Sequence, residues 1–235
     1  MLDCSAWSDQ YRRDGFAVIP HVLDEEQVRA LIAVTDLLAL RSDRRRGGVR
    51  NLLDVSPEVR ELATSPNVLQ IAGAVLERGV VPIRGILFDK TDGANWKVPW
   101  HQDLTIEVAE RLETEGFGPW STKDGVQRVQ PPTSILERMV SIRLHLDDCP
   151  EENGALRVVP GSHKAGRLSE TESARIGAGG PDEVCAVQAG DAVVMSPLIV
   201  HASSASTRLG HRRVIHLDYA HVRLPGGLRW AREQS

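Results

Sequence analysis

The segment Met139–Asp147, MVSIRLHLD, alternates polar and apolar side chains along its length. Successive side chains of a β-strand point to opposite faces, so the alternation predicts a strand with one polar and one apolar face. If the polar face looks into a barrel, Arg143 and His145 would be available to a polar or anionic substrate. If it looks outward, they would have only structural roles. The polar set is Ser141, Arg143 and His145, and the apolar set is Ile142, Leu144 and Leu146.

Short runs of the same kind continue from about residue 80 to the end of the chain, separated by Gly, Pro and Asn. Asn153-Gly154 is a hairpin-turn signal between two of these runs. Seven or eight short strands with few helices between them predict an antiparallel sandwich or jelly roll. We expect strands near 80–90, 98–106, 139–147, 155–159, 184–188, 191–195, 198–204 and 212–222.

The N-terminal part, residues 1–79, is expected to be mostly helical. Asp24 and Gln27 have the spacing of a capping box at a helix start. Ser56-Pro57 and Ser65-Pro66 each combine an N-cap residue with proline at the first helical position, and the second of these helices should stop at Gly79.

We interpret residues 1–235 as a single domain, with a mainly β core over 80–222. Residues 107–138 are too long and irregular for a simple connection, which is typical of a lid-like insertion. Phe117 and Trp120 in this insertion are candidates to close over a substrate, or to pack the insertion itself.

The composition, with 41% hydrophobic and 26% charged residues, is that of an ordinary globular chain, and the formal net charge is −4. This charge disfavours nucleic acid or an anionic membrane as the main partner. No apolar run approaches the length that spans a bilayer, and the N-terminus lacks a secretory pattern. The widely spaced Cys4, Cys149 and Cys185 predict free thiols and a cytoplasmic protein.

The pattern His-x-Asp, which places both side chains on one face of a strand, is the main candidate for metal binding. Two His and one carboxylate on one face is the ligand set of non-haem Fe(II) oxygenases, so a second His must come from a distant strand. The pattern occurs at His101/Asp103, His145/Asp147 and His216/Asp218.

Two of the three pairs lack the setting that a metal site needs. His216/Asp218 is followed only by His221, which is too near to cross the fold, so His216 is better interpreted as a core histidine. Asp147 runs directly into the sequence DCPEENG, where a carboxylate usually caps a turn. His201 nevertheless lies far enough along the chain to supply the second histidine ligand of the His145/Asp147 pair.

His101/Asp103 lies in the aromatic stretch NWKVPWHQD. His201 follows 98 positions after Asp103, at the end of the apolar run PLIVH. Arg212 comes 11 residues after His201, where a buried guanidinium could bind a dicarboxylate in two-pronged fashion. By spacing alone, His201 could equally be a satisfied core residue. Gln102 and Arg213 should point away from the site by strand alternation.

Several motifs together resemble the phytanoyl-CoA dioxygenase family of Fe(II)/2-oxoglutarate oxygenases. These are GFAVIPHVLDEEQVRAL near the N-terminus, VPWHQD, ENGALRVVPGSHK, Gly190-Asp191, and VHASSAS followed by an arginine. The resemblance runs from about Gly15 to Tyr219, and it implies a double-stranded β-helix (jelly roll, cupin-like) with helical N-terminal additions.

The resemblance implies that His101, Asp103 and His201 are the iron ligands. It further implies that Arg212 binds the distal carboxylate of 2-oxoglutarate, helped by Ser203. The cofactors would be Fe(II), 2-oxoglutarate and O2, and a small-molecule metabolite would be hydroxylated with release of succinate and CO2. Related halogenases carry a small residue at the carboxylate position, so Asp103 favours hydroxylation.

Candidate substrate residues are Arg143 and His145, the shared face of Arg84, Phe88 and Lys90, and Trp120. Two alternatives are a catalytically idle jelly-roll binding protein and a metal-dependent hydrolase on a cupin-like barrel. Arg212 argues against both, because neither needs an anchor for a dicarboxylate.

Overall fold

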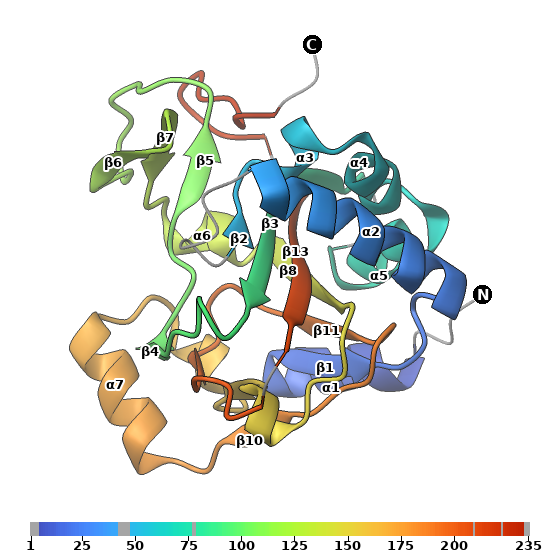
Figure 1. Ribbon diagram of the computed structural model, residues 1–235. Coiled ribbons are helices and arrows are strands. Elements are labelled where there is room, and N and C mark those ends of the chain that lie inside the picture. The colour runs from blue at the N-terminus through green and yellow to red at the C-terminus, as the bar shows by residue number, and fades with distance from the viewer. Residues whose placement is uncertain (1–4, 42–47, 77–78, 209, 222, 233–235) are drawn as a thin grey trace.

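Two antiparallel β-sheets that face each other form the centre of the protein, whose computed structural model describes residues 5–41, 48–76, 79–208, 210–221 and 223–232 (Figure 1). This is the expected jelly roll. The smaller sheet has four strands in the order β10 (Glu183–Cys185), β9 (Leu156–Val158), β12 (His201–Ser203) and β4 (Val98–His101). The larger sheet has six, in the order β1 (Phe16–Ile19), β11 (Ala192–Met195), β8 (Met139–His145), β13 (Arg212–Ala220), β3 (Val81–Lys90) and β2 (Gly48–Val49).

Seven of the eight strands expected after residue 80 are present within a few residues of their predicted bounds, and the eighth, 98–106, is shorter than expected, because β4 ends at His101 and Ile106 begins β5 (Ile106–Val108) of another sheet. The N-terminal part differs from a purely helical segment, because Phe16–Ile19 joins the larger sheet as β1. Phe16 pairs with Met195 of β11, and the run is buried apart from Val18, which is partly exposed. A run of four apolar residues is too short for its period to show in the sequence, so this strand was missed.

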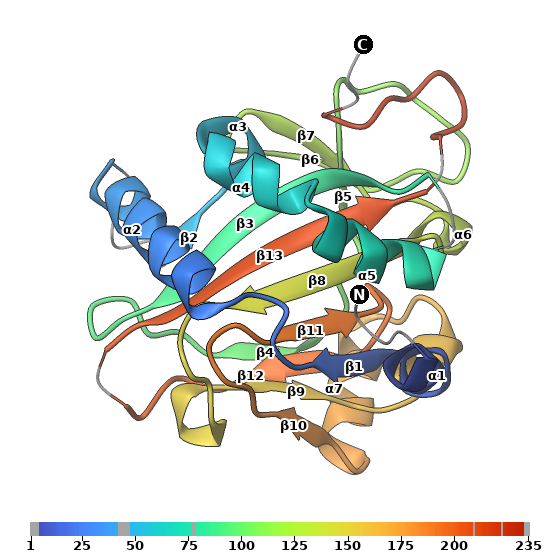
Figure 2. The ribbon, with the colours of Figure 1, turned by 90° about the vertical axis from the view of Figure 1, so that its right-hand side faces the viewer.

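Helices cover the outer face of the larger sheet (Figure 2). The capping box is confirmed, since the amide of Gln27 donates to Asp24 Oδ1 at 2.8 Å and the amide of Asp24 to Gln27 Oε1 at 3.0 Å. Ser56 accepts from the Val59 amide at 3.2 Å, as its position before proline predicts. No helix in the described ranges is long and apolar enough to cross a membrane. The helices of this part are α1 (Ser5–Asp14), α2 (Glu25–Arg41), α3 (Leu52–Val55), α4 (Pro57–Ala63) and α5 (Pro66–Leu76), and Gly79, the expected stop, is not helical.

The apolar face of Met139–His145 packs outward, against the helices. Ile142 and Leu144 join the main hydrophobic core together with Ile215 and Leu217 of β13. Tyr219 belongs to the same core and is fully buried, and its hydroxyl donates to the carbonyl of Ala63 at the end of α4 at 2.8 Å.

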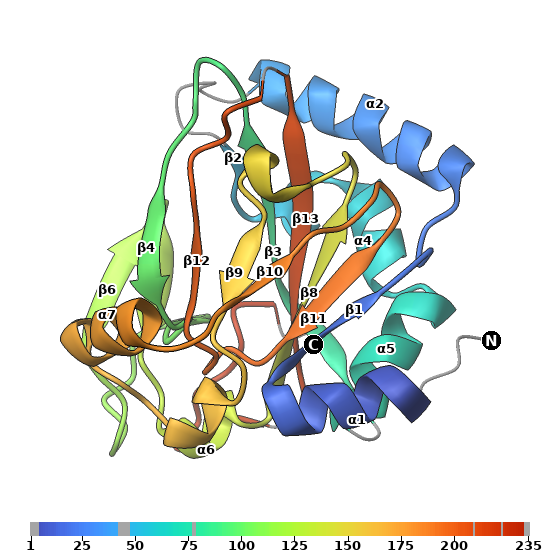
Figure 3. The same cartoon turned by 90° about the horizontal axis from the view of Figure 1, so that it is seen from below.

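The polar face of the same strand therefore looks inward, toward the smaller sheet (Figure 3). Strand register lines up the inward residues of β3, β13 and β8 in rows: Arg84–Asp218–Ser141, Ile86–His216–Arg143, Phe88–Val214–His145, and Lys90–Arg212. These rows decide the question that alternation alone left open. Arg143 and His145 belong to the interior between the sheets, and Arg213 faces away, as expected.

One end of the interior is apolar and closed. Phe16, Val193 and Met195 from the larger sheet pack there against Leu156 and Val158 from β9. The polar rows occupy the rest of the interior, and the cavity between the sheets is lined by residues of these rows.

The connection after β4 is more ordered than the irregular segment expected for residues 107–138. It forms a three-stranded antiparallel sheet, β5 (Ile106–Val108), β7 (Val126–Val129) and β6 (Trp120–Lys123), followed by the short helix α6 (Thr133–Leu136). Trp120 is the only partly buried residue of β6, and Ser121, Thr122 and Lys123 are exposed, so this run is too polar to stand out as a strand in the sequence.

The turn at Asn153-Gly154 does not join a hairpin, and that expectation was wrong. The chain passes there from β8 in the larger sheet to β9 in the smaller one, through a 3-10 turn at Glu151–Asn153. Gly154 has φ of +67°, and a Cβ there would lie 2.5 Å from the carbonyl of Ser204. The smaller sheet is flanked by a second 3-10 turn, Ser162–Ala165, and by α7 (Glu170–Gly179).

Tyr219→Phe tests the contact between β13 and the helical layer. We expect a loss of about 1 kcal/mol in the free energy of unfolding, because a buried hydrogen bond is removed without a cavity. Chemical denaturation measures the change. The side chain faces away from the interior, so metal binding should be unchanged, and an unaltered unfolding midpoint would contradict the assignment.

Candidate metal centre and cosubstrate pocket

Three side chains converge between the two sheets: His101, Asp103 and His201. Strand pairing places His201 directly opposite His101 in the smaller sheet, with ring centroids 4.1 Å apart. One ligand atom from each of the three residues lies within 4.8 Å of the others, and no other group of three such residues is found in the described part of the chain. The structure thus selects this His-x-Asp pair from the three in the sequence.

Backbone contacts orient both imidazoles for metal binding. His101 Nδ1 lies 2.8 Å from the carbonyl of Pro99, and His201 Nδ1 lies 2.9 Å from that of Ile199. A carbonyl can only accept, so each Nδ1 carries the proton and each Nε2 presents a lone pair. These Nε2 atoms lie 3.8 and 3.7 Å from the carboxylate oxygens of Asp103. Three electron-pair donors that face one another fit a cation.

The electrostatics of the site favour the ligand forms of these residues. Burial lowers the pKa of His201 to about 4, which keeps it neutral. Burial opposes ionisation of Asp103, but the basic side chains around it outweigh burial and lower its pKa. A neutral imidazole beside an ionised carboxylate is what a divalent metal requires.

Gln102 holds the loop between the two ligands from the opposite face of the strand. Its Nε2 donates to the carbonyls of Gly166 at 2.9 Å and Leu198 at 2.5 Å, and its Oε1 accepts from the amide of Leu168 at 2.8 Å. Its supportive position was expected from strand alternation. These contacts tie the chain between His101 and Asp103 to the segments before α7 and β12.

A cavity of about 250 Å³ opens beside the three candidate ligands. Among the predicted site residues, Ser203, Arg212, Arg84, Phe88 and Arg143 line it as well. Arg50 and Arg128 also line it, and sequence reasoning missed both, because Arg50 follows the two-residue strand β2 and Arg128 lies within the short strand β7, neither of which carries a clear pattern. Other lining residues are Ile86, Trp96, Val98, Thr105, Leu156, Ala202 and His216.

Trp120, His145 and Lys90 are not among the described residues that line the cavity. Trp120 packs against the hydrophobic cluster under the insertion, with Arg111 5.5 Å from its ring, so its placement does not support a substrate contact. His145 lies inside the barrel, and burial, followed by repulsion from Arg143 and Arg212, lowers its pKa well below the usual value.

The end of the cavity near Arg212 carries buried cations. Arg212 is 3% exposed; its Nη1 donates to the carbonyl of Gly154 at 2.6 Å, and its Nε has no hydrogen-bond partner among the described residues. Lys90, 1% exposed, donates to Ser203 Oγ at 2.9 Å and to the Ser204 carbonyl. Burial, then repulsion from Arg212, lowers the pKa of Lys90 to about 7. No carboxylate of the described residues is paired with either cation, so this end suits an external anion.

The other two His-x-Asp pairs have structural partners. His216 Nε2 lies 2.9 Å from Asp218 Oδ1, and Asp218 also binds Arg84 at 2.5 Å and Ser141 at 2.6 Å. Because Arg143 Nη1 is a donor, 3.2 Å from His216 Nδ1, His216 carries its proton on Nε2.

Asp147 accepts from the amide of Arg213 at 2.7 Å and from its guanidinium at 2.9 Å, which places it outside the barrel. Among the cysteines, Cys149 and Cys185 are free and buried, and burial raises the pKa of both thiols. Cys4 lies outside the described residues.

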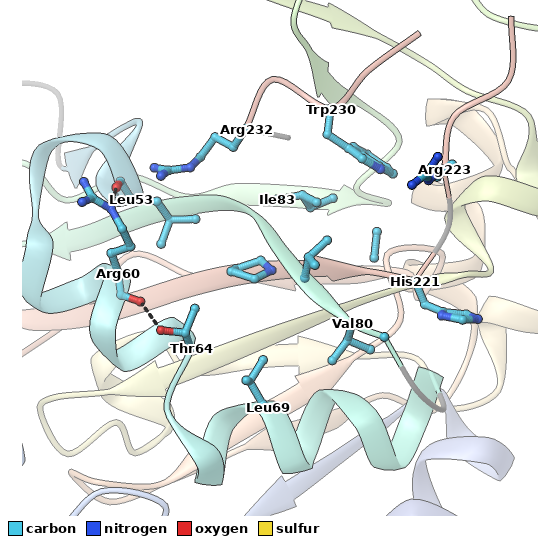
Figure 4. Close-up of a pocket in the computed structure, with 14 residues that line it drawn as sticks. Leu53, Arg60, Thr64, Leu69, Val80, Ile83, His221, Arg223, Trp230 and Arg232 are labelled. Carbon is cyan, nitrogen blue, oxygen red and sulfur yellow. Dashed lines mark hydrogen bonds between the residues drawn. The ribbon is translucent and has the colours of Figure 1, made fainter. Parts of the chain in front are cut away.

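A second cavity, of about 560 Å³, lies on the outer side of the larger sheet, between α4, α5 and the C-terminal segment (Figure 4). Leu53, Leu69, Ile83 and Trp230 supply apolar walls, and arginines approach its rim. It is the larger of the two, but none of the three candidate metal ligands lines it. The chemistry therefore belongs to the smaller cavity.

A jelly roll with two His and one carboxylate on one face is the arrangement of non-haem Fe(II) oxygenases. The model of the phytanoyl-CoA dioxygenase (PhyH) family matches residues 11–214. The chain belongs to this family. It is an Fe(II)/2-oxoglutarate-dependent oxygenase, which confirms the class and the cofactors expected from the sequence.

Three individual proteins illustrate the likeness. L-Proline trans-4-hydroxylase from Streptomyces griseoviridis is 27% identical over 250 residues, which cover 91% of this chain and 85% of that protein. The crystal structure of AviO1 from Streptomyces viridochromogenes Tue57 superposes with a TM-score of 0.70 at 28% identity, covering 96% of this chain and 97% of that one. The epimerase SnoN, in complex with Fe3+, alpha ketoglutarate and nogalamycin RO, shares the fold with a TM-score of 0.72 at 22% identity, over 95% and 91% of the two chains.

Gln102→Leu tests whether the loop between the ligands is held from behind. We expect about a tenfold weaker affinity for Mn(II), used as a stable stand-in for Fe(II), because supporting contacts around metal ligands typically contribute that much. Isothermal titration calorimetry measures the affinity. Arg157→Gln, which removes an exposed ion pair with Asp182, is the control. Equal affinities in Gln102→Leu and wild type would contradict the role.

Proposed function

We propose that His101, Asp103 and His201 are the protein ligands of Fe(II). The single observation that supports this most strongly is the convergence of two histidine ring nitrogens and one carboxylate in the described residues. Each imidazole keeps its orientation through a backbone carbonyl two residues earlier in the chain. The Asp103 carboxylate fills the third protein position, which favours hydroxylation over halogenation.

We propose that the distal carboxylate of 2-oxoglutarate binds at Arg212, Ser203 and Lys90. Arg212 and Lys90 are buried cations without a paired carboxylate, and Ser203 joins them through its contact with Lys90. Lys90 is thus assigned to the cosubstrate, although the sequence suggested it for the substrate. Bound there, 2-oxoglutarate would leave its 2-oxo acid end for the metal that His101, Asp103 and His201 would hold.

When bound, Fe(II), 2-oxoglutarate and O2 together replace a C–H hydrogen of the substrate by a hydroxyl group and leave succinate and CO2. The chain's own residues position the reactants. Arg143 and Phe88 form the floor of the cavity, with the guanidinium 5.4 Å from the ring. The Arg84–Asp218–His216 network keeps that floor rigid, and the apolar end around Phe16 excludes water from one side.

The substrate is a small metabolite, because the cavity of about 250 Å³ must also hold the cosubstrate. L-Proline, the substrate named for the curated relative, is the first compound to test. The insertion 107–138 is proposed as a lid, since Arg128 from it reaches the cavity. We further propose a cytoplasmic enzyme that acts without nucleic acid or membrane.

Anaerobic addition of Fe(II) and 2-oxoglutarate should produce a weak visible charge-transfer band. The band should disappear in Asp103→Ala, because one of the three ligands is lost. In Arg212→Ala the cosubstrate affinity should fall roughly a hundredfold, since a charged buried hydrogen bond is removed. Absorption spectroscopy and succinate release on exposure to air measure both effects. A wild-type protein with neither band nor succinate would overturn the proposal.

The pKa of Lys90, lowered to about 7, gives cosubstrate binding a pH dependence. A carboxylate binds the protonated amine, so affinity should be full below pH 7 and should fall above it by up to about tenfold per pH unit. Lys90→Arg stays protonated and should remove this dependence. Titration of the charge-transfer band between pH 6.5 and pH 8.5 measures it, and equal slopes in the two proteins would contradict the role of Lys90.

A further inference from the structure

Three arginines line the metal cavity on the side away from Arg212. We call Arg50, Arg84 and Arg128 the arginine cluster. They come from separate parts of the fold: the segment after β2, strand β3, and strand β7 of the insertion. Neither the iron ligands nor the cosubstrate site uses them.

Each guanidinium of the cluster is held from behind by one carboxylate. Asp218 binds Arg84 at 2.5 Å, Glu107 binds Arg128, and Asp124 lies 3.3 Å from Arg50 Nε. None of these three acids lines the cavity, where Asp103 is the sole carboxylate among the described lining residues.

A guanidinium has five N–H donors, so one carboxylate behind it leaves others to face a ligand. Arg128 illustrates this, because it is 7% exposed and its Nε has no hydrogen-bond partner in the described residues.

The Arg50 side of the cluster is electropositive, whereas at Arg84 the carboxylates of Asp218, Asp103 and Glu107 outweigh burial and raise the pKa. Burial lowers the pKa of Arg50, and repulsion from Arg128 lowers it further. The pKa of the neighbouring Lys123 is lowered first by Arg50. An anion bound in the cavity would relieve this repulsion.

The arginine cluster contacts the segment that directly follows Asp103, but it lies far from Arg212 and Lys90, where the cosubstrate is proposed to bind. Arg84 Nη1 is 3.5 Å from the carbonyl of Thr105, two residues after Asp103, and Glu107 two residues further on holds Arg128. Arg84 and Lys90 are six residues apart on β3, or about 20 Å. The distal carboxylate of 2-oxoglutarate cannot occupy both places, so an anion at the cluster belongs to another molecule.

We propose that the substrate is a small carboxylate-bearing metabolite whose carboxylate binds the arginine cluster while the C–H bond to be oxidised faces His101, Asp103 and His201. Planar guanidinium groups match a carboxylate in two-pronged geometry. The cavity volume of about 250 Å³ limits the rest of the molecule to a few carbon atoms. This inference rests on the proposed oxygenase function of the same site.

Trifluoroacetate is the probe for the carboxylate site, measured by fluorine NMR on the anaerobic complex with Fe(II) and saturating 2-oxoglutarate. The paramagnetic iron should broaden the resonance of the bound probe in a saturable way. The neutral analogue trifluoroacetamide should show no saturable effect. Saturating cosubstrate keeps the probe away from Arg212.

Arg50→Gln is the principal variant, because the Arg50 side chain is 34% exposed and its loss should leave the fold intact. It should weaken trifluoroacetate binding roughly ten- to a hundredfold, as expected for a charged hydrogen bond. Arg50→Lys should restore part of the affinity. Arg128→Gln should weaken it as well, whereas Arg111→Gln, an exposed arginine of the same insertion, should not.

The charge-transfer band separates failure of this inference from failure of the oxygenase assignment. If the band forms but trifluoroacetate does not bind, or binds equally to Arg50→Gln, the arginine cluster is not a carboxylate site. If the band is absent, the oxygenase proposal itself fails. In a succinate-release screen of small acids paired with their amides, turnover of the acids supports the inference, and equal turnover of the amides overturns it.

Discussion

The convergence of three electron-pair donors between the two sheets is the constraint on which the rest of the structure depends. His101 and His201 are cross-strand partners, and each imidazole donates Nδ1–H to the carbonyl two residues earlier. The two Nε2 atoms and the Asp103 carboxylate therefore face one another and repel unless a cation lies between them. The smaller sheet, the Gln102 contacts and the packing of α7 beside β4 all maintain this arrangement.

The larger sheet contributes positive charge to the interior, opposite to the negative charge of the Asp103 carboxylate. Its inner rows carry Arg84, Arg143, Arg212 and Lys90, which would destabilise a closed hydrophobic interior. The helices bury the apolar face of the same strands, so stability comes from one face and binding from the other. Asp218 neutralises Arg84, whereas Arg143, Arg212 and Lys90 are paired with no carboxylate of the described residues. Buried cations of this kind are a cost to folding that a bound anion offsets.

Much of the fold could be predicted from local patterns. Period-two alternation identified eight strands, and capping residues identified the starts of α2, α4 and α5, because both signals depend on neighbours in the chain. The strands β1, β2, β5, β6 and β7 were missed, because each is only two to four residues long and β6 is also polar. The turn at Gly154 was misread as a hairpin, since a turn signal does not specify whether the next strand pairs with the preceding one or crosses to the other sheet.

The sequence by itself determined the class of the protein, because the spacing of His101, Asp103, His201 and Arg212, in motifs that resemble an oxygenase family, is a property of the chain. Only the tertiary structure decided which His-x-Asp pair is free to bind a metal, since that depends on what each side chain meets across the fold. It likewise placed Lys90 against Ser203 and Trp120 outside the cavity, and brought Arg50 and Arg128 to the same cavity as Arg84. Contacts between residues far apart in sequence are set by sheet register and loop closure, and neither leaves a local trace in the residues themselves.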